Sequence, residues 1–150
     1  MWNNNASGSA DYGRMRVELT GAASGSPFLI TALSGTTGIY QQSIGSSLTT
    51  ASLGTFSHYA VAFYNDGSNL ITKLYVNGVL NDTNSASSTL NELNSVGMTG
   101  RIGALLTSSA SPSGPAGQAY SGKLSGSLDE FRFWKTRRDS KQIFDNYNKQ

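Results

Sequence analysis

The sequence predicts an all-β fold, an antiparallel β-sandwich with one short C-terminal helix. Three observations carry this prediction. Apolar residues recur in short runs with the period of two that a half-buried strand requires. Small polar loops rich in Gly, Ser, Thr and Asn separate these runs, and helical spacing occurs only near the C-terminus. Only 13% of the residues are charged, against about a quarter in ordinary domains, which argues against a helical bundle. The length of 150 residues fits one domain, residues 1–150.

Extended segments follow one another at short intervals. The predicted strands cover residues 15–19, 28–33, 39–44, 58–64, 70–76, 101–106 and 123–134. In the first strand Met15, Val17 and Leu19 alternate with polar residues, so one face is expected inside and the other outside. In the last strand the apolar residues change face between Leu128 and Phe131, which predicts a bulge or burial on both sides.

Two local signals fix a hairpin and the helix. Asn77-Gly78 between two apolar runs predicts a type I′ turn, because both residues of that turn need a positive φ. Asp139 with Gln142 three residues later predicts a helix N-terminus with a capping box. The stripe at helical spacing that follows consists of Ile143, Phe144 and Tyr147.

Composition and charge exclude several classes of protein. The chain has no Cys and one His, which excludes disulfides, thiolate chemistry and a multi-histidine zinc site within one chain. The net charge is +2, and residues 132–150 hold six cations against two anions. A charge run of this kind is typical of a solvated end, so nucleic acid is not expected as a partner. The chain as given shows neither a signal peptide nor a membrane-spanning segment.

Four stretches in one order resemble a known family. They are GTFSHYAVAFYNDG, LYVNGVLNDT, GRIGAL and SGSLDEFRFW, the last followed by a short helix. This order resembles the concanavalin A-like lectin/glucanase superfamily, and within it the laminin-G-like and pentraxin-like jelly rolls. The string from GRIGAL through KLSGSLDEFRFWKTRR is also similar to modules in structural proteins of marine tailed phages. The resemblance implies a concanavalin A-like jelly roll.

The sequence departs from this family at two places. Phe56 stands where the family usually has Trp, two residues before His58. The strands that usually precede the segment at Arg14 are expected to be shortened, absent or supplied by a partner. An unpaired edge in such a sandwich would need a cover.

Catalysis is not expected. The resemblance places His58 as a structural strand residue, and no carboxylate neighbours it in sequence. Asp129 and Glu130 are adjacent, so on a strand they would point to opposite faces and could not flank one glycosidic bond. Apart from Glu130 the chain holds only Glu18 and Glu92, and none has the alternating spacing of the glucanase members. Asp129 is expected to pair with Arg132 or Arg101.

Calcium is the one cofactor that the residues suggest. Ca²⁺ takes six to eight oxygen ligands, which Asp and Asn side chains supply. Asn65, Asp66 and Asn69 form one loop cluster, and Asn81, Asp82 and Asn84 form another. The candidate ligands are Asn65, Asp66 and Asp82. The alternative is that these residues only form turns, for which Asn, Asp and Gly are the usual residues.

Two functions remain open. Sugar binding would use loop aromatics as stacking platforms, and the candidates are Tyr12, Tyr40 and Tyr120, with Trp2 beside them. The first hypothesis is a non-catalytic, lectin-like module of a larger surface or phage virion protein that binds a glycan or cell-surface polymer. The second is a structural domain that only mediates assembly, as a homo-oligomer or with a neighbouring virion protein. Both predict an extracellular or virion-associated protein.

Overall fold

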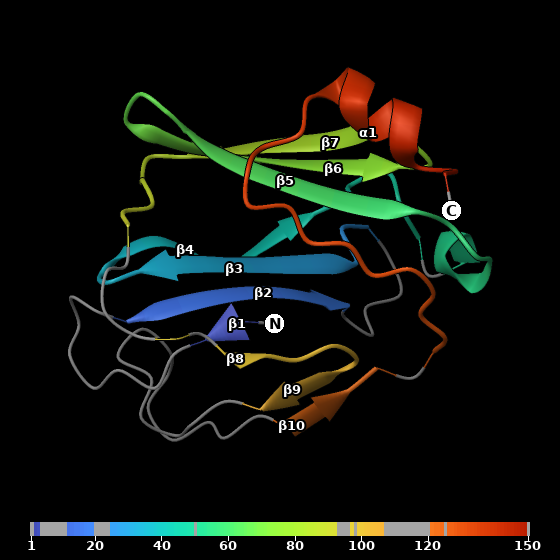
Figure 1. The fold of residues 1–150 in the computed structure, drawn as a ribbon, viewed down its shortest axis with the longest axis horizontal. Helices are drawn as coiled ribbons and strands as arrows, with labels where there is room; N and C mark the ends of the chain where they lie inside the picture. Colours follow the sequence, from blue (N-terminus) through green and yellow to red (C-terminus); the bar gives the residue numbers. More distant parts are fainter. Residues whose placement is uncertain are drawn as a thin grey trace.

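The computed structural model describes residues 2–3, 12–19, 25–49, 51–92, 97, 99–106, 121–124 and 126–149. It confirms the predicted all-β class, because the antiparallel strands form two stacked sheets with one short C-terminal helix. Figure 1 shows the three-stranded sheet and the helix at the top, with the five-stranded sheet and a small two-stranded pair below.

The larger sheet has the strand order β4-β3-β2-β1-β8. Its strands are β1 (Trp2–Asn3), β2 (Gly13–Leu19), β3 (Phe28–Ser34), β4 (Thr37–Ile44) and β8 (Thr99–Gly100). The smaller sheet, in the order β5-β6-β7, consists of β5 (Tyr59–Asp66), β6 (Asn69–Val76) and β7 (Val79–Ala86). The remaining elements are the pair β9 (Ala104–Leu106) and β10 (Ser121–Lys123), the 3-10 turn η1 (Ala51–Gly54) and the helix α1 (Ser140–Asn146).

The hydrophobic core lies between the two sheets. Alternate residues of β3 meet alternate residues of β6, as the period of two predicts, whereas β4 contributes Ile39 and Ile44 from either side of an irregularity in its pairing. The buried set comprises Phe28, Ile30, Ala32, Ile39, Ile44, Leu48, Leu70 and Leu74. The ring of Phe28 lies 5.2 Å from the ring of Tyr59 on β5, which joins the sheets at one end of this core.

The β6–β7 hairpin confirms the predicted turn. Asn77 has φ 49° and Gly78 has φ 81°, the two positive values that a type I′ turn requires. The Asn77 side-chain oxygen accepts a hydrogen bond from the backbone N–H of His58 at 2.9 Å. The turn is therefore also attached to the start of β5.

The apolar residues of β2 face the core side of the sheet as predicted, but their predicted burial is wrong. Val17 and Leu19 are 44% and 45% exposed, whereas the alternating Arg14 and Arg16 are only 4% and 1% exposed. Val17 pairs with Ile30, so the apolar side chains do face the inner side of the sheet. The smaller sheet has only three strands and packs on β3 and β4, which leaves the inner face of β2 partly uncovered. The arginines lie on the outer face, away from this core.

The long strand predicted over residues 123–134 is also wrong. Only Ser121–Lys123 is paired, as β10, and the described residues from 126 to 139 form no strand. Glu130 has φ 50°, in the left-handed region that ends an extended run. This residue lies between Leu128 and Phe131, where the apolar pattern changes face. The change of face therefore occurs at a residue with a left-handed backbone conformation, and not at a bulge within a continuous strand.

Residues 126–149, the C-terminal segment, run past β5 and end on the outer side of the smaller sheet (Figure 1). The predicted capping box is present: Gln142 N donates to Asp139 Oδ1 at 2.7 Å, and Asp139 N donates to Gln142 Oε1 at 3.1 Å. Ile143 is buried, while Phe144 of the same predicted stripe is exposed. The Tyr75 hydroxyl lies 3.0 Å from Ser140 Oγ, which attaches the start of α1 to β6. Of the helical residues described, none form a span that could cross a membrane.

Candidate functional site

The predicted sugar-binding tyrosines have different environments. Tyr12 is 3% exposed, with the Arg14 guanidinium carbon 5.4 Å from its ring centre, so this ring is not an open stacking platform. Tyr40 is half-buried on β4, beside the irregularity where Gln41 adopts φ 49°. Tyr120 lies outside the described residues. Trp2 belongs to β1, where only its backbone is described. Tyr40 and Tyr120 therefore stay as untested predictions.

The first calcium cluster is already engaged in local structure. Asn65 uses both ends of its amide on Leu90: Nδ2 donates to the Leu90 carbonyl at 2.8 Å, and Oδ1 accepts from Leu90 N at 2.9 Å. Asp66 is exposed at the end of β5. It pairs with Asn69, whereas Asp82 pairs with Leu74, five positions along β6, or about 17 Å. The three candidate ligands thus do not form one set.

Asp82 binds backbone N–H groups. Its Oδ2 accepts from Gly45 N at 2.8 Å and from Ser46 N at 2.9 Å, and its Oδ1 accepts from Thr83 N at 2.8 Å. Burial alone would raise the pKa of Asp82, but the hydrogen bonds outweigh it and hold the pKa below its ordinary value. This carboxylate joins β7 to the end of β4. Nowhere in the described ranges do three His, Cys, Asp or Glu side chains gather as a metal would need.

His58 lies half-buried just before β5. Its ring centre is 6.2 Å from that of Tyr147, and Nδ1 is a buried atom that makes no hydrogen bond to any residue in the described part of the chain. Burial, and after it the positive charge of Arg132, lower the pKa of His58 below its ordinary 6.5. A neutral ring packed beside the C-terminal segment agrees with the structural role expected for this residue.

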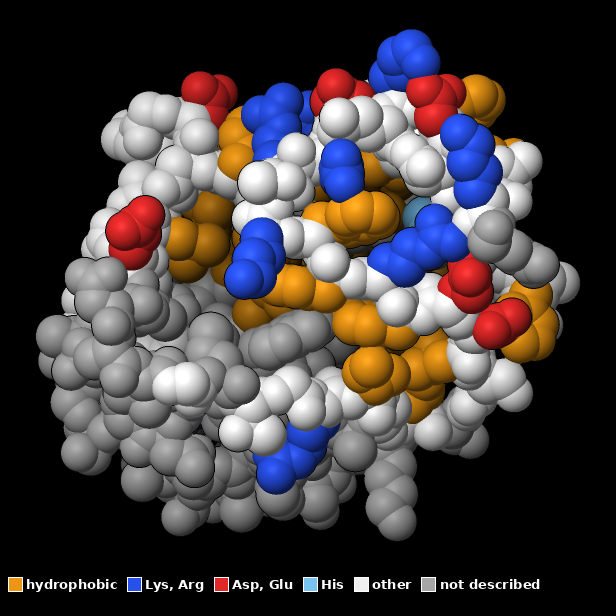
Figure 2. All heavy atoms as spheres, viewed as in Figure 1, with side chains coloured by type: hydrophobic (Ala, Val, Ile, Leu, Met, Phe, Trp, Pro, Cys, Tyr) orange, Lys and Arg blue, Asp and Glu red, His pale blue; other side chains and the backbone are white. Residues whose placement is uncertain are grey.

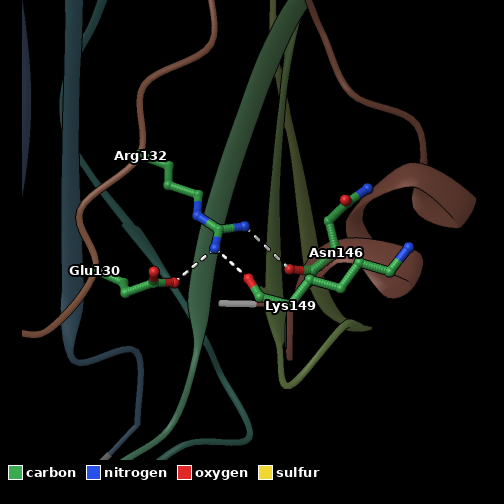
Figure 3. Close-up of polar contacts among 4 residues, drawn as sticks. All are labelled: Glu130, Arg132, Asn146 and Lys149. Atoms are coloured by element: carbon green, nitrogen blue, oxygen red, sulfur yellow. Dashed lines mark hydrogen bonds and ion pairs between the residues drawn. The ribbon is translucent and has the colours of Figure 1, made fainter.

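Arg132 joins the segment after β10 to the end of α1 (Figure 3). Its Nη2 lies 2.6 Å from Glu130 Oε2 and also donates to the Lys149 carbonyl, while Nη1 donates to the Asn146 carbonyl at 3.3 Å. Arg132 thus pairs with Glu130, not with Asp129 as the sequence suggested. Helix C-terminal carbonyls are otherwise unpaired and attract a cation. This arrangement is structural, and it occupies one of the three glutamates.

Aromatic rings and cations meet on the outer side of the smaller sheet. The Arg137 guanidinium lies 3.9 Å from the ring centre of Tyr64, and the Arg138 guanidinium lies 4.0 Å from that of Trp134. Lys73 lies on the neighbouring strand β6, and its Nζ is 5.9 Å from the centre of the Tyr64 ring. These five residues are called the aromatic–cation surface below. Figure 2 shows hydrophobic side chains interspersed with Lys and Arg over this part of the molecule.

The aromatic–cation surface combines two recognition chemistries. Trp134 is 47% exposed, so part of its indole is available as a flat apolar contact. A guanidinium stacked on a ring is held in one orientation, and the N–H groups at its edge remain able to bind acceptor oxygens. Such a surface suits a ligand with apolar C–H faces and many oxygens.

The sequence pattern hid this surface. Trp134 was expected in the core because it ends a run that alternates like a strand, and the cations after it were expected to be only solvated. The signal that would have found it is the direct succession of Trp134, Lys135, Thr136, Arg137 and Arg138. Because residues 126–139 form no strand, aromatic and guanidinium groups so close in sequence can fold onto one another.

Comparison with known proteins gives one match. A family model of laminin G type, described as "Concanavalin A-like lectin/glucanases superfamily", matches residues 2–144. No curated protein and no solved structure matches the chain. The family match covers both sheets and most of α1.

Proposed function

The chain belongs to the concanavalin A-like lectin/glucanase superfamily, and from this premise we propose a non-catalytic, lectin-like module that binds a glycan or another cell-surface polymer. Modules of the laminin G type are typically binding domains and are often extracellular. The observation that carries the proposal is the aromatic–cation surface, in which Trp134 is exposed beside an ordered arginine. We place the module in a larger surface or virion protein.

The environments of the carboxylates support a non-catalytic role. Glycoside hydrolysis needs two carboxyl groups that flank one bond, with one of them free to transfer a proton. Glu18 is paired with Arg16 at 2.5 Å, and Glu130 with Arg132 at 2.6 Å. They lie on different elements, β2 and the C-terminal segment. Each of these two carboxylates is therefore engaged by an arginine rather than free to transfer a proton.

The test is a glycan array probed with the purified chain, once with calcium and once with EDTA. We expect Trp134→Ala to weaken binding at least about tenfold, because an aromatic anchor at the centre of a surface carries much of the binding free energy. Phe56→Ala is the matched control, since Phe56 is 79% exposed and lies outside this surface. Tyr40→Ala and Tyr120→Ala test the two remaining predicted aromatics in the same assay.

The comparison of calcium with EDTA also tests whether the predicted ligands bind calcium. If the Asn65, Asp66 and Asp82 carbonyl and carboxylate groups served calcium, EDTA would remove binding. We expect equal binding in both conditions, because Asn65 and Asp82 are engaged with backbone groups. Absence of binding to every glycan would refute the lectin-like proposal.

A second function, assembly without a small ligand, is favoured by exposed apolar side chains. Several large hydrophobic residues on the C-terminal segment and the β6–β7 turn are between 46% and 62% exposed. They are Val79, Leu80, Leu128, Phe131, Phe133, Trp134 and Phe144. Large apolar side chains exposed in this number are found at protein interfaces when they form one patch. A stable multimer in analytical ultracentrifugation, with no glycan bound, would support assembly; a monomer that binds glycan would exclude it.

A further inference from the structure

The outer face of β2 buries positive charge. Arg14 and Arg16 alternate along the strand and are 4% and 1% exposed. Directly opposite Arg16 on β3 is Thr31, which is fully buried, and opposite Arg14 is Leu33. Guanidinium groups stay protonated in proteins, so the charge cannot be lost by deprotonation. A buried charge must be compensated by a counter-charge and by hydrogen bonds.

The compensation within the described residues is incomplete. Glu18 Oε2 lies 2.5 Å from Arg16 Nε, so one carboxylate serves two arginines. Arg16 Nη1 and Nη2 and Arg14 Nε are buried atoms that have no hydrogen-bond partner among the residues that the structure describes. The cluster of Arg14, Arg16, Glu18 and Thr31, called the outer arginine cluster, thus has a net charge of +1 and several unused donors. An unmade hydrogen bond of a buried charged group is among the costliest defects in a fold.

The unused donors have a common geometry. Arg14 and Arg16 are two residues apart on one face of a strand, about 7 Å along it. Thr31 Oγ1 accepts from Gln41 N at 3.0 Å, which leaves the hydroxyl proton available to donate. Directly opposed residues on paired strands bring their Cβ atoms to within about 5.5 Å, so this hydroxyl is close to the Arg16 side chain. Two guanidinium groups and one hydroxyl therefore lie on the same outer face of β2 and β3, with the Arg14 guanidinium carbon 5.4 Å from the Tyr12 ring centre.

We infer that the outer arginine cluster binds a monovalent anion with two acceptor oxygens, a carboxylate group. A carboxylate bound between Arg14 and Arg16 would separate the two positive charges. The charges along β2 would then alternate in sign from Arg14 to Glu18. Guanidinium groups match carboxylates in bidentate geometry, and such charge-assisted bonds are strong. The apolar Leu33 beside Arg14 lowers the local dielectric and strengthens the attraction.

This site is independent of the proposed lectin function. It lies on the outer face of the five-stranded sheet, whereas the aromatic–cation surface lies on the outer side of the three-stranded sheet, across the core. The carboxylate group has two sources, a free small anion or an acidic sugar. Both present the same chemistry to the arginines.

The test titrates sodium formate into the purified chain at constant ionic strength and measures the urea unfolding midpoint together with the ¹³C linewidth of formate. In the unaltered chain we expect a saturable rise of the midpoint and saturable line broadening, because a ligand that binds only the folded state stabilises it. In Arg16→Met both responses should disappear. Lys149→Met, which removes the same charge from an exposed position, should respond like the unaltered chain.

Glu18→Gln keeps the inference testable if Arg16→Met fails to fold. Removing the competing carboxylate should lower the half-saturating formate concentration by about tenfold, since one repulsive charge is lost. A midpoint independent of formate in the unaltered chain, or an unchanged half-saturation in Glu18→Gln, would overturn the inference. Glucuronate and glucose separate the two sources: glucuronate acting at lower concentration than formate, with glucose inactive, identifies an acidic sugar, and formate acting at equal or lower concentration identifies a free anion.

Discussion

Replacing Asp82 by Asn tests whether this carboxylate is a structural group or a calcium ligand. The residue accepts three hydrogen bonds from Gly45, Ser46 and Thr83 and joins β7 to the end of β4. Asn keeps one acceptor oxygen and places an NH₂ group where the other oxygen was. The substitution therefore removes the bonds at one oxygen and sets donor against donor there.

The expected loss follows from these contacts. A hydrogen bond to a charged group contributes about 1.5–3 kcal/mol, and the half-buried position of Asp82 favours the lower end. We expect Asp82→Asn to lower the free energy of unfolding by about 2 kcal/mol, which for a chain of this length lowers Tm by about 4–8 °C. Asp66→Asn removes the same charge from an exposed position and should change stability by less than about 0.5 kcal/mol.

The pH dependence of the free energy of unfolding tests the role of Asp82 independently. The pKa of Asp82 is lower in the folded than in the unfolded chain, so the unfolded chain binds the proton more tightly. Its contribution to stability is present above the unfolded pKa and is lost as the pH falls through the folded pKa. The free energy of unfolding should therefore fall less steeply in Asp82→Asn than in the unaltered chain as the pH falls from the unfolded through the folded pKa of Asp82.

The assay is urea unfolding followed by tryptophan fluorescence, in calcium and in EDTA. The structural interpretation expects the same loss in both. If calcium stabilised the unaltered chain and Asp82→Asn removed only that increment, Asp82 would be a metal ligand and the reasoning above would be refuted.

Three further outcomes are expected. Gly78→Ala should destabilise the chain by about 2–3 kcal/mol in urea, because φ is 81° and the added Cβ would lie 2.6 Å from Tyr147 Cδ1; a loss below about 1 kcal/mol would show that the turn relaxes freely. The single His58 should show a pKa below 6.5 when titrated by NMR, and Arg132→Gln should raise that pKa. The stability that the chain loses on acidification from pH 6.5 to the folded pKa of His58 should then be smaller. An unchanged pKa in Arg132→Gln would contradict the assigned cause. Asp139→Ala should cost about 1 kcal/mol through loss of the N-cap, whereas Asp139→Ser should retain most of the stability, and equal losses would contradict the capping role.

Parts of the candidate site could not be read from the chain. The burial of Tyr12 and the stacking of Arg138 on Trp134 both depend on segments distant in the sequence or on the exact point where a strand ends. Residues 126–139 form a surface segment with exposed aromatics in place of the expected strand, and Glu130 within it adopts φ 50°. No pattern of hydrophobicity encodes that choice, since both outcomes use the same residues.

What the sequence determined by itself is local. The turn at Asn77-Gly78 and the capping box of Asp139 depend on the φ angles and side-chain lengths of a few consecutive residues, and both appear as predicted. The sheet class follows from the period of two in the same way. The tertiary structure alone decided that Val17 and Leu19 are exposed, because their burial depends on how many strands the facing sheet has, and that Arg16 on the opposite face is buried. The fold, and not the local sequence pattern, therefore determines which charged side chains are buried.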